Sequence, residues 1–228
     1  MQPTSENASS IQLPVNLEVR VVLFSLQNNQ LQTLLLPVKN MPEKWQIPGS
    51  PLIAARSLEE TAAACLVAYI GRREAYLEQL YTYGHPLRDP SCQLVSVVYF
   101  ALIPADAFSM PDLSIHEARW YAIENQPDLI GDHGDILAYA LRRLRYKLEY
   151  TAAGFELLPE NFSLTELQRT YEMILGEKLD KRNFRRRILN AGIIEPTPHQ
   201  RIGEGRPARL FRYRPDAVAE VKARRLFP

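Results

Sequence analysis

The stretch that decides the fold runs from Asp180 to Pro215: D-K-R-N-F-R-R-R-I-L-N-A-G-I-I-E-P, a loop, and then G-E-G-R-P-A-R-L-F-R-Y-R-P. Between Lys181 and Arg214 it carries ten basic and two acidic residues, a net charge of +8, whereas the whole chain has a net charge of +1. Such a local excess of positive charge indicates a polyanionic partner.

The first part of this stretch is predicted to be a short amphipathic helix. Asp180 can cap its start, Gly192 can end it, and Phe184 and Ile188 recur at helical spacing. The polar side chains outside this apolar stripe are mostly Arg and Asn, which pair bidentately with guanine and adenine edges in the major groove. The helix residues predicted to contact DNA are Lys181, Arg182, Asn183, Arg185, Arg186 and Arg187.

Two strand-like runs follow this helix, I-I-E-P-T and A-R-L-F-R-Y-R-P, around a turn rich in Gly, Pro and Arg. The preceding L-T-E-L-Q-R-T-Y-E-M-I-L-G predicts a supporting helix, so the whole segment has the outline of a winged helix-turn-helix. Arg206 and Arg209 of the wing are expected to contact DNA with little dependence on base sequence. The alternative is a solvated basic helix followed by a hairpin, without a DNA partner.

Composition sets the broader limits. With 228 residues and 46% hydrophobic residues, the chain can bury one large core or two modest ones, and its charge asymmetry favours two domains. No apolar run approaches a membrane span, and the first ten residues lack the pattern of a signal peptide. We therefore expect a cytoplasmic protein without a membrane partner.

The first half of the chain begins as a predicted β-hairpin. L-E-V-R-V-V-L-F and L-Q-T-L-L-L read as strands around the polar turn Q-N-N-Q. The segment W-Q-I-P-G-S-P-L (Trp45 to Leu52) then bends the backbone before a helix that opens with S-L-E-E. In this helix Ser57 and Glu60 form a capping box.

At this helix the sequence resembles the Nudix fold. The framework W-Q-I-P-G-x21-G, from Trp45 to Gly71, matches in length the Nudix box G-x5-E-x7-R-E-U-x-E-E-x-G-U, where U is a bulky aliphatic residue. Nudix hydrolases use carboxylates of this box to hold Mg2+, a hard cation that prefers oxygen ligands. The aligned positions hold instead Arg56, Ala64, Cys65, Ala68 and Tyr69.

This departure predicts a domain with no catalytic residues and no metal site, because Ala, Cys and Tyr cannot replace the missing carboxylates. Glu59 and Glu60 remain, and helix capping accounts for them. The alternative function is a Nudix hydrolase of ADP-ribose-type substrates that uses Glu59 and Glu60 as unconventional metal ligands and its basic tail to capture RNA or substrate.

Beyond this helix, further segments follow in order: Y-L-E-Q-L-Y-T-Y-G-H-P-L-R-D-P, L-V-S-V-V-Y-F-A-L-I-P, E-A-R-W-Y, D-H-G-D-I-L-A-Y-A-L-R-R-L-R-Y-K-L-E-Y, F-E-L-L-P-E-N-F-S-L-T-E-L-Q-R-T-Y-E and L-D-K-R-N-F-R-R-R. Together they resemble the NrtR family, the Nudix-related transcriptional regulators of NAD metabolism, and the resemblance runs from about Leu13 to Pro215.

The resemblance implies an α+β chain: a Nudix-like α/β/α sandwich with a mixed sheet, then a winged helix-turn-helix. The expected boundaries are 1–12 for a disordered tail, 13–150 for the effector domain with a joining helix that Asp132 caps, and 151–228 for the DNA-binding domain. The joining helix carries Leu137, Leu141, Leu144 and Leu148 on one face.

The resemblance also implies a homodimeric regulator, most often a repressor, that binds a palindromic double-stranded operator of NAD-metabolism or related genes. Its controlling ligand would be a nucleotide effector, ADP-ribose or a related metabolite, with no further cofactor. The expected effector residues are Gln46, Tyr83, Arg88 and Asp89. Here Tyr83 would stack on a base and Arg88 would pair with a phosphate.

Other interpretations of these residues remain open at this point. Tyr83 also suits ordinary sheet packing, and Arg88 suits an ion pair with Asp89. A metabolite-binding scaffold that has lost DNA binding is a third function.

Overall fold

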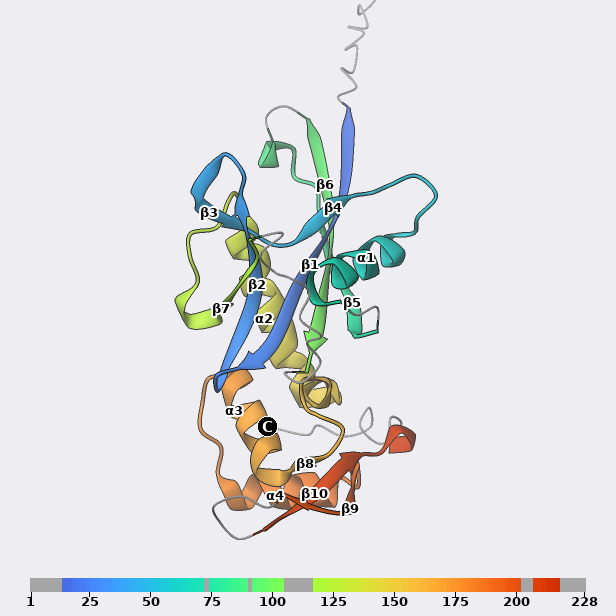
Figure 1. The fold of residues 1–228 in the computed structure, drawn as a ribbon, viewed down its shortest axis with the longest axis vertical. Helices are drawn as coiled ribbons and strands as arrows, with labels where there is room; N and C mark the ends of the chain where they lie inside the picture. Colours follow the sequence, from blue (N-terminus) through green and yellow to red (C-terminus); the bar gives the residue numbers. More distant parts are fainter. Residues whose placement is uncertain (1–13, 72–73, 90–91, 105–116, 202–206, 218–228) are drawn as a thin grey trace, which may run out of the picture.

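The computed structural model of the chain describes residues 14–71, 74–89, 92–104, 117–201 and 207–217. The predicted tail, residues 1–12, and Arg206 lie outside these ranges. An α/β part and a winged-helix part follow one another along the long axis of the molecule (Figure 1). The predicted α+β fold class is confirmed.

The N-terminal hairpin forms as the sequence predicts. Strand β1 (Val15–Gln27) pairs antiparallel with β2 (Gln30–Val38), and Gln27 faces Gln30 in the register. The two turn residues between them, Asn28 and Asn29, have φ angles of 52° and 59°. Asn tolerates this left-handed conformation, which the tightest β-hairpin turns require.

A mixed sheet grows from this hairpin. Its further strands are β3 (Met41–Gln46), β4 (Gly49–Pro51), β5 (Tyr76–Tyr83), β6 (Gln93–Ile103) and β7 (Arg119–Ala122). The main order is β3-β2-β1-β6-β5, with β4 paired to β1 and β7 paired to β2. Only β1 and β6 run parallel among the described strands. The segment that the sequence predicts as a bend between Trp45 and Leu52 therefore also contributes the end of β3 and all of β4.

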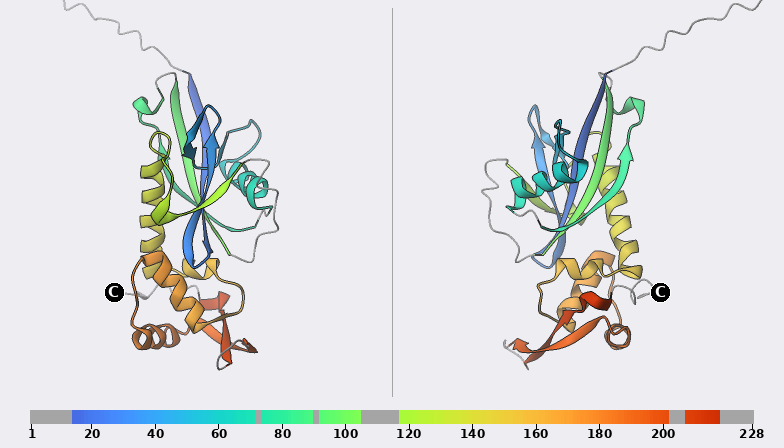
Figure 2. Two further views of the ribbon diagram at one scale, coloured as in Figure 1. Left: turned by 60° about the vertical axis from the view of Figure 1, so that its left-hand side comes forward. Right: turned by 90° about the vertical axis from the view of Figure 1, so that its right-hand side faces the viewer.

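One helix covers each face of this sheet (Figure 2). Helix α1 (Leu58–Ile70) starts with the predicted capping box of Ser57 and Glu60, and α2 (His133–Tyr150) lies on the opposite face. Alternate residues of β1 point to the two sides: Val21 packs in the cluster with α1, and Val22 packs in the cluster with α2. Within the described residues, no helix combines the length and apolar character that a membrane span requires.

The C-terminal part has the predicted winged-helix outline. Helix α3 (Leu164–Leu175) supports α4 (Lys181–Asn190), and β9 (Ile194–Arg201) and β10 (Ala208–Tyr213) form the wing. A short strand, β8 (Phe162–Ser163), completes a sheet of order β8-β10-β9. Short 3-10 turns lie at Pro86–Arg88 (η1), Ile123–Asn125 (η4), Ala153–Leu157 (η5) and Pro215–Ala217 (η6).

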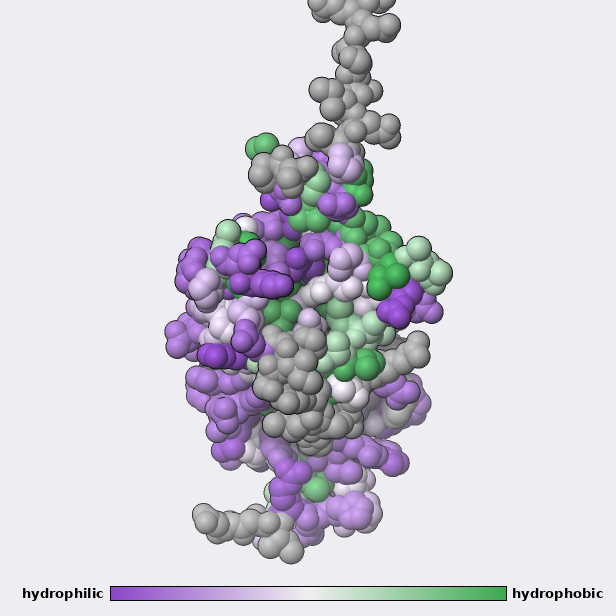
Figure 3. All heavy atoms as spheres, turned by 45° about the horizontal axis from the view of Figure 1, so that its top comes forward, coloured by the Kyte–Doolittle hydropathy of each residue, from purple (hydrophilic) through white to green (hydrophobic). Residues whose placement is uncertain are grey.

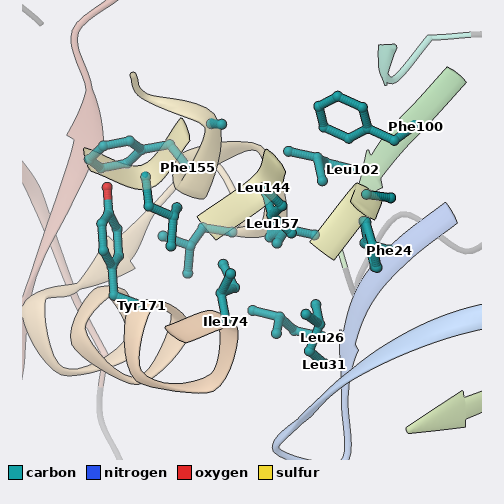
Figure 4. Close-up of a cluster of buried hydrophobic side chains, with 14 of the residues drawn as sticks. Phe24, Leu26, Leu31, Phe100, Leu102, Leu144, Phe155, Leu157, Tyr171 and Ile174 are labelled. Atoms are coloured by element: carbon teal, nitrogen blue, oxygen red, sulfur yellow. The ribbon is translucent and has the colours of Figure 1, made fainter. Parts of the chain in front are cut away.

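The two parts share one hydrophobic core. Leu144 of α2 is fully buried where Leu102 of the sheet approaches Phe155 of η5 and Ile174 of α3 (Figure 4). The joint at η5 is tight, because a Cβ on Gly154 would lie 2.9 Å from side-chain atoms of both Leu148 and Tyr171. A contact of this kind resists independent motion of the two parts.

Candidate nucleic-acid interface and effector site

Helix α4 is positioned by its cap and by two core side chains. The Asp180 carboxylate accepts the Asn183 backbone N–H at 2.8 Å, which confirms the predicted N-cap. The helix ends at Asn190 with Ala191 as its C-cap, and the predicted Gly192 follows with a left-handed φ of 67°. Phe184 and Ile188 are 2% and 0% exposed. The Phe184 ring meets the Tyr171 ring of α3 edge-on, with 5.5 Å between centroids. These contacts decide which face of α4 looks outward.

The outward face of α4 carries the chemistry for reading bases. Lys181, Arg182 and Arg186 are exposed, and one Arg186 nitrogen donates to the Asn183 side-chain oxygen at 2.9 Å. This bond holds a guanidinium and a side-chain amide side by side, the two groups that recognise guanine and adenine. Among the described residues, Arg182 makes no ion pair.

Arg185 and Arg187 are placed differently from this outward group. Arg185 is partly buried and donates to the Thr165 hydroxyl of α3 at 3.0 Å, so it also braces the two helices against each other. Arg187 is likewise only partly exposed. Their predicted DNA contacts remain predictions.

Several arginines in and next to the wing are neutralised by acidic side chains. Arg201 pairs with Glu166 at the start of α3, Arg212 with Glu195 across the hairpin at 2.5 Å, and Arg214 with Asp216 at 2.6 Å. Glu195 is already counted in the net charge of +8, but Glu166 and Asp216 lie outside Lys181–Arg214, so two further arginines are neutralised and the segment offers less charge to DNA than +8. The remaining charge is concentrated on α4 and on Arg209, which is exposed beside Phe211 with its Cζ 5.8 Å from the ring centroid.

The predicted effector residues lie at the end of β3, at the end of β5 and in and after η1. The label of β3 stands in the α/β part, well away from that of α4 (Figure 1). Figure 3 views the molecule with the α/β part tilted forward and shows hydrophobic residues on one side of it and hydrophilic residues on the other. Three of these residues, Gln46, Tyr83 and Arg88, belong to one hydrogen-bonded polar network between the sheet and the start of α2.

One half of this network is centred on Arg20 of β1. Its guanidinium binds both carboxylate oxygens of Glu18, at 2.7 and 2.8 Å. The remaining nitrogen donates to the Ile47 carbonyl at 2.7 Å and to the Gln46 side-chain oxygen at 3.3 Å. Burial opposes ionisation of Glu18, but the bonds and charge of Arg20, helped by the Ser96 hydroxyl, hold its pKa below the ordinary range.

The other half is centred on Arg88, whose side chain is 8% exposed. It binds both oxygens of Asp132, at 2.6 and 3.0 Å, and donates to the Tyr83 carbonyl at 2.9 Å and the Ser96 hydroxyl at 2.8 Å. The Ser96 hydroxyl donates in turn to Glu18 at 2.5 Å, which joins the halves. The carboxylate that holds Arg88 is thus that of Asp132, rather than the neighbouring Asp89 that the sequence suggested.

Tyr83 and Asp89 flank this arginine. The Tyr83 ring lies 5.8 Å from the Arg88 Cζ and meets the Tyr81 ring edge-on, and burial raises the pKa of its hydroxyl to about 12. Asp89 ends the η1 turn that carries Arg88. Tyr83 is partly buried against the α2 side of the sheet, in keeping with the alternative of sheet packing.

His133, the first residue of α2, links this helix to the end of the sheet that carries Gln46 and Ile47. Its Nδ1 accepts the Ile47 backbone N–H at 3.0 Å, and the side chain is buried. Burial first, and then the charge of Arg20, lower the pKa of His133 to about 4. Arg88 therefore binds the N-cap residue of α2 directly, whereas Gln46 is linked to α2 through its neighbour Ile47, which binds His133.

Sequence reasoning missed Glu18, Arg20, Ser96, Asp132 and His133 as parts of this site. One signal was available, because L-E-V-R-V-V places two charges on the same face of a strand that is otherwise apolar. Buried charges require partners, so such a pair indicates a polar network. Asp132 does occupy the N-cap position of α2, but its side chain makes no capping hydrogen bond, contrary to the prediction.

Replacing His133 by Gln is expected to reduce the loss of stability in acid. Because the folded-state pKa of about 4 lies below the ordinary 6.5, the unfolded state takes up the proton first as the pH falls. Neutral His133 therefore contributes its full share of the folding stability above about pH 6.5, and this share is lost as the pH falls toward about 4. Between pH 7.5 and 5 the loss in the free energy of unfolding amounts to about 2 kcal/mol. Urea unfolding at both pH values measures it.

Gln is a suitable replacement because its side-chain oxygen can still accept the Ile47 N–H. The exposed His199 of β9 provides the control substitution, His199→Gln, which should leave the pH dependence as it is. If His133→Gln and the parent protein lost the same free energy of unfolding between the two pH values, His133 would not be the titrating group.

The helix that corresponds to the Nudix box has no carboxylate at the expected positions. Burial raises the pKa of Cys65 to about 11, so it stays a thiol. The Glu60 carboxylate accepts the Ser57 N–H at 2.8 Å in the capping box, and Glu59 accepts the Tyr99 hydroxyl at 3.1 Å. In the described ranges, no cluster of three or more His, Cys, Asp or Glu side chains is placed to hold a metal ion.

Comparison with known proteins finds relatives with both parts. Residues 154–213 match the family described as the NrtR DNA-binding winged helix domain. The ADPR responsive transcriptional repressor NtrR of Acinetobacter baylyi is 39% identical over 201 residues, 86% of this chain and 80% of that protein.

Solved structures of Shewanella oneidensis NrtR show the same arrangement. The complex with a 27mer DNA has a TM-score of 0.79 at 32% identity and covers 92% of this chain and 96% of that one. The complex of its Nudix domain with ADP ribose has a TM-score of 0.50 at 31% identity and covers 57% of this chain and 89% of that one.

Proposed function

The chain belongs to the NrtR family, and from this premise we propose that it is a transcriptional repressor that releases its operator DNA when ADP-ribose binds to its Nudix-like part. The observation that carries the proposal is the winged helix that this chain shares with its relatives, whose α4 presents Arg182 and Arg186 to solvent with Asn183 beside them. We divide the chain at Thr151, with residues 13–150 as effector domain and 151–228 as DNA-binding domain. In bacteria like those of its relatives, such a repressor works in the cytoplasm.

The DNA contacts are proposed in two groups. Arg182, Asn183 and Arg186 would read base edges, because they are the outward Arg and Asn side chains of α4. The others would bind phosphates and set the register: Lys181, Arg185, Arg187, Arg206 and Arg209. Two winged helices related by a two-fold axis read two half-sites, so we further propose a homodimer on a palindromic operator.

For the effector we propose the end of the sheet that holds Gln46, Tyr83, Arg88 and Asp89. The support is that Gln46 and Arg88 share one polar network, that Arg88 binds Asp132, the N-cap residue of α2, and that Ile47, the neighbour of Gln46, donates its backbone N–H to His133 of α2. A ligand that moves either residue therefore acts on the helix that leads to the DNA-binding part.

We propose that the Nudix-like part does not hydrolyse its ligand. Arg56, Ala64, Cys65, Ala68 and Tyr69 supply no carboxylate to hold Mg2+. Glu60 is committed to the cap of α1, and the regulators among the relatives favour a sensor over the alternative hydrolase with Glu59 and Glu60 as ligands.

The test begins with genomic fragments that the purified protein retains, because these supply the operator. ADP-ribose at saturation is then expected to weaken the operator complex in a mobility-shift assay by about 5- to 150-fold, the usual range of coupling between two ligands. In the same tubes, with Mg2+ or Mn2+ present, no AMP should form above the level of a mock preparation.

AMP serves as the control ligand, since it lacks the diphosphate and the second ribose. A protein that released AMP from ADP-ribose, and lost this activity in a Glu59→Gln, Glu60→Gln double variant, would be the alternative hydrolase. A protein that retained no specific fragment at all would not be a repressor.

A further inference from the structure

The Arg88–Asp132 ion pair engages the guanidinium that is predicted to bind a phosphate of the effector. The Arg88 side chain donates four hydrogen bonds, two to the Asp132 carboxylate and one each to the Tyr83 carbonyl and the Ser96 hydroxyl. In this state it has no edge left to bind a ligand phosphate. Either Arg88 is purely structural, or one of its partners gives way.

Asp132 is the partner that solvent can reach. Its side chain is 32% exposed, whereas that of Arg88 is 8% exposed, and Ser96 is fully buried. The carboxylate takes the Nε and one terminal nitrogen of the guanidinium at 2.6 and 3.0 Å. A phosphate accepts from the same edge in the same bidentate geometry, so it can replace this carboxylate and no other partner of Arg88.

The Asp132 carboxylate also has an alternative partner, the backbone N–H groups at the start of α2. Asp132 is the N-cap residue of α2, yet it makes no capping bond and has φ −92° and ψ 11°. The N-cap residues of α1, α3 and α4, which are Ser57, Ser163 and Asp180, are all extended and all accept a backbone N–H of the helix. Arg88 therefore holds Asp132 away from the cap that its side chain favours.

We propose that the Arg88–Asp132 pair is the closed form of an anion subsite of the effector site. A phosphate of the ligand replaces the Asp132 carboxylate on Arg88, and Asp132 turns to cap α2. This inference rests on the proposed function, since it assigns the diphosphate of the effector to Arg88. The exchange keeps Arg88 paired, so no buried charge is left without a partner.

The exchange acts on an element that reaches the DNA-binding part. Asp132 precedes α2 at one end, and near the other end the Arg145 Nε donates to the Ile174 carbonyl in the last turn of α3 at 2.8 Å. Helix α3 then holds α4 through the Tyr171–Phe184 ring contact. The two arrangements of Asp132 thus supply the two-state element that coupling between effector and DNA requires.

The test compares Asp132→Asn with Asp128→Asn. Asp132→Asn removes the competing charge but keeps a side chain that can cap α2. We expect it to bind ADP-ribose at least 10-fold more tightly than the parent protein by calorimetry. Its operator affinity without ligand should fall toward that of the parent saturated with ADP-ribose. Asp128 pairs with Lys44 nearby, its side chain is 72% exposed, and its substitution should change neither affinity.

Inorganic pyrophosphate and inorganic phosphate are titrated alongside ADP-ribose, which separates a nucleotide site from a general anion site. Equal ADP-ribose affinity of the parent and Asp132→Asn overturns the subsite and leaves the proposed function standing. Tighter pyrophosphate binding by Asp132→Asn, without any ADP-ribose binding, supports the subsite and overturns the effector. If neither protein binds ADP-ribose and Asp132→Asn does not bind pyrophosphate more tightly than the parent, both the subsite and the proposed effector are overturned.

Discussion

Replacing Arg182 and Arg186 together by Ala is expected to weaken operator binding by about 2–6 kcal/mol, because each arginine can make one bidentate base contact worth about 1–3 kcal/mol. The loss should fall on operator DNA far more than on random DNA, since base contacts carry the sequence preference and phosphate contacts do not. Affinities for both duplexes, measured by fluorescence anisotropy at one fixed salt concentration, give the result.

The structure supplies a matched control for this double variant. Arg212 is also exposed, with 57% of its side chain accessible, but Glu195 neutralises it at 2.5 Å. Arg212→Ala should therefore cost little. Arg209→Ala should weaken all duplexes alike and reduce the salt dependence by about one phosphate contact.

The assignment of α4 as the reading helix depends on the sequence preference. If the Arg182, Arg186 double variant kept its full preference for operator over random DNA, another element would be reading the bases. Misfolding is a poor explanation for any loss, because both side chains are exposed and Ala favours a helix.

Replacing Leu144 by Ala is expected to destabilise the whole molecule by about 2–5 kcal/mol, the usual cost of a cavity left by a fully buried leucine. Leu144 lies in the core that joins the sheet to the winged helix (Figure 4). Both parts should therefore unfold in one transition, at a lower urea concentration than in the parent protein. Tryptophan fluorescence and circular dichroism, followed together, measure it.

Leu141→Ala serves as the comparison for this leucine. Leu141 lies one turn earlier on α2 but is only partly buried, at the wall of a cavity of about 600 Å³ between the β1–β2 turn, α2 and the end of α3. Its truncation removes fewer contacts and should cost clearly less. Two separate unfolding transitions in the parent protein would contradict a shared core.

The same substitution bears on regulation. If the packed α2 transmits the effect of ADP-ribose, Leu144→Ala should reduce the coupling between ADP-ribose and operator, while each ligand still binds by itself. The coupling to be reduced is typically about 1–3 kcal/mol and acts equally in both directions. A full coupling in a variant that has lost several kcal/mol of stability would assign the transmission to another contact.

Local features of this protein follow from the sequence because their partners lie close along the chain. The Asn28–Asn29 turn needs only residues that tolerate positive φ. The caps by Ser57, Ser163 and Asp180 reach three residues ahead. The winged-helix outline and the outward Arg182 and Arg186 follow from helical spacing in the same way.

Which partner each charged residue finds is decided only by the tertiary structure. Arg88 finds Asp132 at a distance of 44 residues along the chain, and His133 accepts an N–H 86 residues away. Arg201 is neutralised by Glu166, 35 residues earlier. Local rules cannot choose among the many acids that could serve each arginine, because the choice depends on which strands and helices pack together.

By itself, then, the sequence determined the two-part architecture, the helix with outward arginines and the absence of carboxylates at the Nudix-box positions. The tertiary structure decided which arginines stay available to DNA, that Arg88 is held by Asp132, and that α2 belongs to the cores of both parts. The physical reason is range: hydrogen-bonded caps and turns act over a few residues, whereas burial brings distant charges together and requires each to have a partner.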